Sequence, residues 1–436
     1  MSRTVTIPHL GRVEGHGGIR VSLTDTRVTE VNMDIHEGSR YYEKLLLGKD
    51  FRDVQGIITR ICAICSADHT VVALSALENA LGVRESERTA VLRGLLLHGA
   101  AVESHALHVF ALALPDFLGF ESVMAMAGRH PDEVAFALRL KQLGNRIQTV
   151  VGGRAVHPIN TVVGGFGKLP GHRTIDSLRG ELVDVVDDLT RAVELVASID
   201  VPDWAARPTL FVGLRPSGDG FGYRGGSICT SAGAEIGVED YRESVREFSV
   251  EHSHARHAAL ESGETYMVGS LARLALWGGR LTGLASQAFA ELFPSGGTDN
   301  ILLNTRAQLV EIVFSVESAI EACEALLGLD EVGGDHPRIE ARAGLGVAAI
   351  EAPRGTLIHE YELDGEGRVT AANVVTPTAQ NLANLERDLR WAGDRLLGET
   401  APSVESMKRS FELIARAYDP CISCSVHVAQ LGGKRP

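Results

Sequence analysis

Four cysteines in two Cys-x-x-Cys pairs carry the clearest chemistry in this sequence of 436 residues. Cys62 and Cys65 lie near the start of the chain, and Cys421 and Cys424 lie near its end. Two residues between the cysteines let both sulfurs of a pair turn toward one ion. Together the pairs supply four soft anionic ligands, which suit zinc, nickel or iron.

The spacing of the cysteines leaves the metal open. Zinc ribbons keep their two pairs about 15–20 residues apart, whereas a zinc ion here would staple the whole fold. A thioredoxin-like redox pair is disfavoured, because neither pair follows a clear strand in a βαβ unit. A cubane iron–sulfur cluster is compatible with the cysteine count. The remaining cysteines stand alone: Cys323 falls on an apolar helical stripe and is expected in the core, and Cys229 is expected to be inert.

Composition and charge exclude some classes of function. Hydrophobic residues are 44% and charged residues 22% of the chain, as in ordinary globular proteins. The formal net charge of −14 argues against nucleic acid as a main partner, because phosphate binding needs a basic surface. No apolar signal segment opens the sequence. The most apolar stretch, 95–120, contains three histidines and two acidic residues, which are costly in lipid. We therefore expect a cytoplasmic protein without a membrane span.

The elements that must position the cysteines are predicted from periodicity and turn chemistry. Alternating apolar residues predict a hairpin over 19–36, and a second hairpin is expected where 356–363 and 368–375 flank Asp364-Gly365-Glu366-Gly367. Between them the periodicity is mostly helical, with one apolar stripe over 309–327. The fold class is therefore α+β, with terminal strands packed on a long central helical region.

A glycine-rich segment at 213–227 is predicted to be a loop. It contains Gly220-x-Gly222-x-x-Gly225, which matches a dinucleotide-binding fingerprint. Such a fingerprint follows a buried strand and opens a helix, and neither is evident here. We expect no nucleotide on this chain.

The residues around the cysteines resemble a known family. Both flanks match the two signature motifs of nickel–iron hydrogenase large subunits, and further segments match in the family's order. These segments are Arg60-x-Cys62-x-x-Cys65-x-x-x-His69, Tyr418-Asp419-Pro420-Cys421-x-x-Cys424-x-x-His427, Arg12-Val13-Glu14-Gly15-His16, Arg40-Tyr41-Tyr42-Glu43, Glu103-Ser104-His105-Ala106-Leu107-His108, Glu351-Ala352-Pro353-Arg354-Gly355 and Thr376-Pro377-Thr378-x-x-Asn381. The chain looks most like the α subunit of the cytoplasmic NADP-linked hydrogenases, or sulfhydrogenases.

The resemblance implies a mostly helical large-subunit fold, with a central helical bundle and small terminal β-hairpins or sheets. It implies that all four cysteines bind nickel. Cys62 and Cys421 would be terminal ligands, whereas Cys65 and Cys424 would also bridge to an iron that carries carbon monoxide and cyanide. Such a metal pair can polarise dihydrogen, and a terminal thiolate can take the proton.

Other residues gain roles from the same resemblance. Glu14 would relay a proton from Cys421, because a carboxyl group both accepts and donates one. Arg354 would lie above the open metal site and act in catalysis, with Asp116 near it. His69 would tune a bridging sulfur.

Two further sites are implied. Pro377 and Thr378 would line the cyanide pocket, where a hydroxyl can donate to a cyanide nitrogen. Glu43 and His427 would bind a separate magnesium or second iron, which suits a carboxylate and waters. His105 and His108 are expected to be satisfied core residues.

The implied activity is reversible oxidation of dihydrogen, with electrons passed to an iron–sulfur small subunit and on to NADP or NAD. The two isolated cysteines cannot hold an electron relay. Further partners would be a flavin-containing diaphorase, additional iron–sulfur subunits and a maturation endopeptidase. The acceptor stays open between NADP, NAD and polysulfide. The alternatives are a structural subunit of the respiratory complex I type and a zinc-stapled binding module.

A single large-subunit domain is expected over 1–436. The resemblance places a cleavage after His427, which would release 428–436 as a C-terminal propeptide. That tail carries Lys434 and Arg435 and would hold the last two cysteines away from the closed site until nickel is loaded.

Overall fold

The computed structural model describes residues 3–330, 338–399 and 402–426. An antiparallel three-stranded sheet opens the chain, in the order β1-β2-β3. Its strands are β1 (Arg3–Ile7), β2 (Gly17–Leu23) and β3 (Val28–Ile35). The β2–β3 pair is the first predicted hairpin, with Ile19 opposite Met33 and Val21 opposite Val31 on the buried face. Alternation of apolar and polar residues therefore predicted this element correctly.

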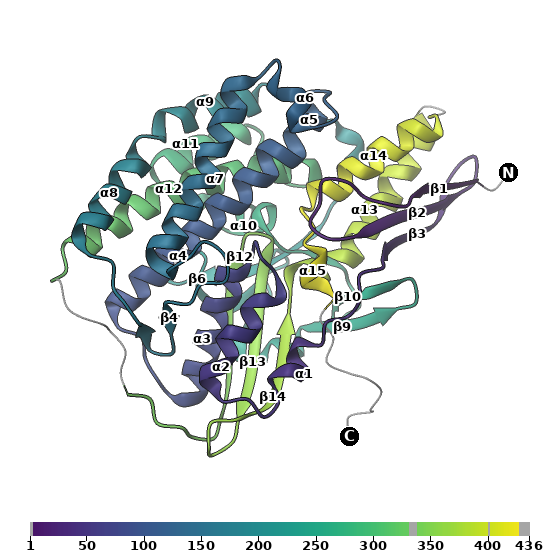
Figure 1. Ribbon diagram of the computed structural model, residues 1–436. Coiled ribbons are helices and arrows are strands. Elements are labelled where there is room, and N and C mark those ends of the chain that lie inside the picture. The colour runs from purple at the N-terminus through teal and green to yellow at the C-terminus, as the bar shows by residue number, and fades with distance from the viewer. Residues whose placement is uncertain (1–2, 331–337, 400–401, 427–436) are drawn as a thin grey trace.

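Helices make up much of the middle of the chain, and most of them lie together at the upper left of Figure 1. These helices are α3 (Ser66–Leu81), α4 (Glu87–Ala106), α7 (Pro131–Gly152), α8 (His172–Val183), α9 (Val186–Ala197), α10 (Ser270–Trp277), α11 (Gly283–Leu292) and α12 (Asn304–Leu327). Helices α7 and α12 both pack against α4. The apolar stripe predicted over 309–327 lies on α12, and Cys323 is fully buried there as expected.

The middle of the chain differs from the mostly helical prediction. Along the chain, the helical region is interrupted between α9 and α10 by a four-stranded sheet, in the order β11-β6-β7-β8, and by a two-stranded hairpin. The strands are β6 (Leu210–Pro216), β7 (Gly225–Thr230), β8 (Glu235–Gly237), β9 (Val245–Val250), β10 (Ser253–Leu260) and β11 (Tyr266–Met267).

Part of the predicted glycine-rich loop at 213–227 is strand. Strand β6 does precede the Gly220-x-Gly222-x-x-Gly225 motif, which corrects the prediction, but β7 and not a helix follows it. The motif therefore joins two antiparallel strands, and the expectation of a glycine-rich hairpin without a nucleotide fingerprint agrees with this connection.

The C-terminal part combines a sheet with three helices. Strands β12 (Gly344–Ala352), β13 (Gly355–Leu363) and β14 (Val369–Val375) form an antiparallel sheet, and β13–β14 is the second predicted hairpin. Helices α13 (Pro377–Glu399), α14 (Val404–Ala417) and α15 (Ile422–Ser425) follow. Helix α3 packs on β12 so closely that a Cβ at Gly346 would overlap the carbonyl oxygen of Ala76. This contact fixes the first cysteine pair relative to the C-terminal sheet.

Short elements complete the described chain. They are α1 (Tyr42–Leu46), α2 (Phe51–Ile58), η1 (Thr59–Ile61), the π-helical η2 (Leu107–Ala113), α5 (Leu114–Phe117), α6 (Val123–Ala127), β4 (Thr161–Val162), β5 (Gly165–Phe166), η3 (Asp203–Ala205), η4 (Val238–Glu243), η5 (Gly278–Arg280) and η6 (Ile301–Leu303).

One helical run, Glu87–Phe117, is long and apolar enough to cross a membrane by length and composition. Of its most apolar window, 78% is buried inside the protein, as in the core helix of a folded domain. His105 and His108 are both buried in this core, and the expectation of satisfied histidines holds for both ring nitrogens of His108, whereas Nδ1 of His105 has no hydrogen-bond partner among the described residues. The Nε2 atom of His105 lies 3.0 Å from Glu311 Oε2, and that of His108 lies 2.7 Å from the carbonyl oxygen of Arg416.

Candidate metal centre

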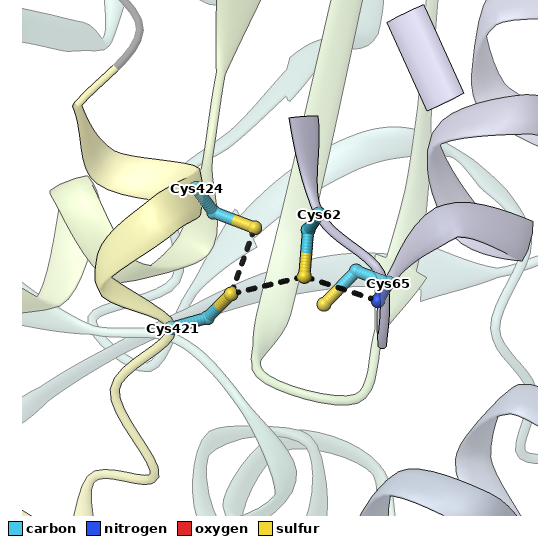
Figure 2. Close-up of side chains that lie close together, drawn as sticks. All are labelled: Cys62, Cys65, Cys421 and Cys424. Atoms are coloured by element: carbon cyan, nitrogen blue, oxygen red, sulfur yellow. Dashed lines mark hydrogen bonds between the residues drawn. The ribbon is translucent and has the colours of Figure 1, made fainter. Parts of the chain in front are cut away.

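The two cysteine pairs meet at one buried point, as Figure 2 shows. All four sulfur atoms lie within 4.8 Å of one another. Cys421 Sγ lies 3.3 Å from Cys62 Sγ and 3.0 Å from Cys424 Sγ. The prediction that pairs at opposite ends of the chain converge on one ion agrees with this geometry.

The local backbone structure around each cysteine pair turns its sulfur atoms toward this buried point. Cys62 follows η1 in an extended conformation, and Cys65 precedes the first turn of α3, so that the backbone N–H of Cys65 donates to Cys62 Sγ at 3.3 Å. The second pair flanks the start of the short helix α15. The N–H of Cys421 donates to Thr378 Oγ1 at 3.0 Å, and the N–H of Ile422 donates to the carbonyl oxygen of Glu14 at 3.0 Å.

The electrostatics of the four sulfurs call for a cation. Hydrogen bonds from Cys421 lower the pKa of the Cys62 and Cys65 thiols, whereas burial raises the pKa of Cys421. Four thiolates so close together and so well buried would repel one another and lose hydration. A soft divalent ion bound by all four would remove both costs, so the residues present fit a nickel site.

Arg354 lies against this centre and is buried. Its Nη1 atom is 3.4 Å from Cys65 Sγ and donates to Ser104 Oγ at 3.1 Å. Its Nε and Nη2 atoms donate to the carbonyl oxygen and Oδ1 of Asp419, at 2.7 and 2.8 Å. Contacts with Ser104, Asp419 and Cys65 therefore fix the guanidinium beside a sulfur.

Asp116 was expected near Arg354, but its ion pairs among the described residues are with other arginines. Asp116 forms ion pairs with Arg12 and with Arg416, whose Nε lies 2.7 Å from Asp116 Oδ2. Among the described contacts, the carboxylate on Arg354 is that of Asp419, which has a left-handed backbone with φ of 49°. Such a conformation is costly for a residue other than glycine, and the hydrogen bonds to Arg354 hold it in place.

Glu14 lies on the other side of the centre. Its Oε2 atom is 3.3 Å from Cys421 Sγ and accepts from the N–H of Ser423 at 2.9 Å. The hydroxyl of Ser423 donates to Glu14 Oε1, and the same hydroxyl lies 3.3 Å from Glu37 Oε1. Arg12, two residues before Glu14 in the chain, forms an ion pair with Asp116 and not with Glu14.

His69 lies behind the second pair, with Nε2 at 3.8 Å from Cys424 Sγ. Its Nδ1 atom is 3.0 Å from His359 Nε2, and His359 Nδ1 is 2.7 Å from Tyr361 Oη. All three side chains are buried. A phenol that donates to His359 would set the tautomers so that His69 presents an N–H to the sulfur.

The start of α13 supplies the wall beside Cys421. Pro377 is the first residue of this helix, and Thr378 Oγ1 accepts from the backbone N–H of Cys421. Since that bond uses only a lone pair, the hydroxyl proton of Thr378 stays available to donate.

Glu43 lies buried on α1. Its Oε1 atom accepts from the N–H of Val374 at 3.0 Å, and its Oε2 atom has no hydrogen-bond partner among the described residues. Burial raises the pKa of Glu43 to about 7. An unpartnered carboxylate oxygen suits a hard cation. His427, the other predicted ligand, and the tail 428–436 lie outside the described residues.

Several residues that form this centre were not predicted from the sequence. They are Glu37, Ser104, His359, Tyr361, Asp419 and Ser423. Asp419 and Ser423 stand within the second cysteine motif, so their place beside Cys421 was a usable signal.

Comparisons with known proteins define the class. The chain matches the family model for nickel-dependent hydrogenase over residues 40–136 and 316–427. It is 37% identical to sulfhydrogenase 1 subunit alpha of Pyrococcus furiosus, with 98% of each chain covered. It is 29% identical to the NAD-reducing hydrogenase HoxS subunit beta of Cupriavidus necator, with 98% of this chain and 95% of that one covered.

The fold agrees with these matches. A crystal structure of an NAD+-reducing [NiFe]-hydrogenase in the H2-reduced state superposes with a TM-score of 0.88 and 26% identity, over 98% of this chain and 99% of that chain. The chain belongs to the nickel-dependent hydrogenase family. The predicted α+β large-subunit fold is confirmed. The comparisons support an enzyme of this family and not the two alternatives, a complex I-type subunit and a zinc-stapled module.

Proposed function

We propose that this chain catalyses the reversible oxidation of dihydrogen to two protons and two electrons. The observation that carries the proposal is the buried quartet of thiols with a carboxylate, Glu14, 3.3 Å from one of its sulfurs. A nickel–iron centre held by Cys62, Cys65, Cys421 and Cys424 would supply the Lewis acidity that polarises dihydrogen.

The protein's own groups then handle the proton. Cys421 accepts it on sulfur, and Glu14 takes it from there because its Oε2 lies within reach. The hydroxyl of Ser423 links Glu14 to Glu37, which is partly exposed. The proton leaves by this route, since each group can both accept and donate one.

Other side chains would hold the iron's small ligands. Thr378 would donate its hydroxyl proton to cyanide, and Pro377 would close the pocket with an apolar wall. Arg354 directs its positive charge at the open position, with its geometry fixed by Asp419. Cys65 and Cys424 would hold the iron together with the nickel, and His69 would donate toward Cys424, whose sulfur lies 3.8 Å from its Nε2.

Glu43 would hold a magnesium ion or a second iron, for which its Oε2 is unpartnered among the described residues, together with His427 and waters. The mature chain ends at His427 after an endopeptidase removes 428–436. Residues 1–427 then form one large-subunit domain.

Electrons leave through a partner chain. The relatives are named as subunits of larger hydrogenases, and the two cysteines outside the quartet, Cys229 and Cys323, are each buried and isolated. An iron–sulfur small subunit therefore supplies the relay, with a flavin-containing diaphorase and further iron–sulfur subunits reducing NADP or NAD. We place the assembly in the cytoplasm.

Isotope exchange tests this function without any electron acceptor. Purified nickel-loaded protein in H2O under D2 should release HD, because the deuteron from cleavage leaves through Glu14 and a solvent proton replaces it before dihydrogen re-forms. A Cys421→Ser variant should release none. Absence of HD from protein with a full complement of nickel would overturn the proposal.

A further inference from the structure

A second cluster of metal-ligating side chains lies away from the four cysteines. It consists of His252, His257 and Glu386, each of which offers a ligand atom within 4.8 Å of the others. His252 lies in the turn of the β9–β10 hairpin, His257 lies on β10, and Glu386 lies on α13. The hairpin packs against both β3 and α13 (Figure 1).

His257 is the residue that points to a missing ligand. Its side chain is 1% exposed, and neither ring nitrogen has a hydrogen-bond partner within the described part of the chain. Its Nε2 atom lies 3.5 Å from Glu386 Oε1, beyond a good hydrogen bond but suited to two ligands of one ion. Buried polar groups of this kind are rare in folded proteins unless a water or an ion completes them.

The remaining distances fit a transition-metal ion. His252 Nε2 lies 2.8 Å from Glu386 Oε1. In a tetrahedral site with bonds of about 2.0–2.1 Å, ligand atoms lie about 3.3–3.4 Å apart. The separations of 2.8 and 3.5 Å bracket this value, so small shifts would seat an ion.

The backbone is arranged to bring these ligands together. In a regular strand, side chains five positions apart face opposite sides of the sheet. The β9–β10 pairing shifts register between Ser253 and Arg256, and this bulge lets both histidines reach Glu386. The N–H of Met33 on β3 donates to Glu386 Oε1 at 2.8 Å and orients the carboxylate.

We propose that His252, His257 and Glu386 bind a divalent transition-metal ion of the zinc class, separate from the nickel site and from Glu43. Two imidazoles and one carboxylate leave a coordination position for water, because His252 and Glu386 are partly exposed. Imidazole ligands disfavour magnesium and calcium. The ion would staple the hairpin to α13.

Metal titration of the nickel-loaded enzyme tests the proposal, which does not depend on the proposed function. After chelator treatment that leaves nickel in place, Zn2+ is added under equilibrium dialysis and zinc per chain is measured. The wild type should bind one more zinc ion than Glu386→Gln at low free Zn2+. The variant's affinity should fall by at least about 10- to 100-fold, the range for losing even an outer-sphere partner.

Matched variants separate a site from general effects. The amide that replaces the carboxylate in Glu386→Gln still offers an oxygen to the N–H of Met33, so this variant should fold, and its nickel content confirms this. His252→Gln should also lose the zinc, whereas His254→Gln, which changes an exposed histidine of the same hairpin, should keep it. Zinc should raise the melting temperature of the wild type and of His254→Gln, but not that of Glu386→Gln or His252→Gln. The proposal would be overturned if Glu386→Gln bound as much zinc as the wild type, or if the wild type bound no additional zinc. His252 and Glu386 would then be a hydrogen-bonded pair without a metal ion.

Discussion

Glu14 Oε2 lies 3.3 Å from Cys421 Sγ, across a sequence separation of 407 residues. The contact joins the segment between β1 and β2 to the residue that precedes α15, because an isolated β-bridge pairs Glu14 with Cys421 and Ile422 donates to the Glu14 carbonyl oxygen. A proton acceptor is thus built into the backbone pairing that positions a metal ligand.

Glu14→Gln should keep nickel, iron and their infrared bands while turnover falls by about 10²–10⁴-fold, the usual contribution of a proton-transfer group. Glutamine fits the same volume and can hydrogen-bond, but it cannot exchange a proton. Dihydrogen uptake and isotope exchange measure the loss. Glu14→Asp is the control and should retain some activity with a shortened reach. Turnover like that of the wild type in fully metallated Glu14→Gln would show that protons leave by another route.

Arg354→Lys should lower activity although the positive charge remains. The guanidinium uses three nitrogens to contact Ser104, Asp419 and the sulfur of Cys65, and a lysine amine cannot reach all of them. We expect about a 10²-fold loss of turnover with nickel content unchanged, in keeping with removal of a fixed electrostatic group. Activity equal to the wild type would assign Arg354 a purely structural role.

Magnesium should stabilise the protein more as the pH rises through about 7. Burial raises the pKa of Glu43 to about 7 from an unfolded value near 4.5. Ionisation of the buried carboxyl therefore destabilises the folded protein: this loss of stability is absent below pH 4.5, grows as the pH rises, and is complete above pH 7. A cation at Oε2 would remove that cost. The melting temperature with and without Mg2+ should therefore differ more at pH 8 than at pH 6. Glu43→Gln should abolish the difference, and an effect independent of pH would contradict this site.

The mature subunit should end at His427. Intact-mass measurement of purified active enzyme should show the loss of Val428 to Pro436, whereas protein made without nickel should keep this segment. Full activity in a chain that retains the tail would contradict the maturation step.

The sequence predicted the elements whose signals are local. Alternation over 19–36 and strong turn residues at 364–367 located two hairpins, and the stripe over 309–327 located α12. The strands β6 to β11 were missed, because glycine-rich edges and short strands there carry little periodicity. Burial by neighbouring elements, rather than local pattern, makes them strands.

The site divides in a similar way. The four cysteines were predictable because metal ligation dictates residue type and spacing. The roles of Ser423, Glu37 and His359 could not be predicted, because these residues act here only through partners that lie far away along the chain. Ser423 and Glu37, for example, are 386 residues apart. The ion pairs of Asp116 and Arg354 could not be predicted for the same reason: Asp116 pairs with Arg12 and Arg416, and Asp419 pairs with Arg354.

The metal content of the active enzyme tests the central claim most directly. Four soft ligands around one ion predict about one nickel per chain in purified protein that consumes dihydrogen. A serine at any one of Cys62, Cys65, Cys421 or Cys424 should remove both nickel and activity, because a serine hydroxyl stays protonated and ligates poorly. Active wild-type protein that contains zinc but no nickel would contradict the account.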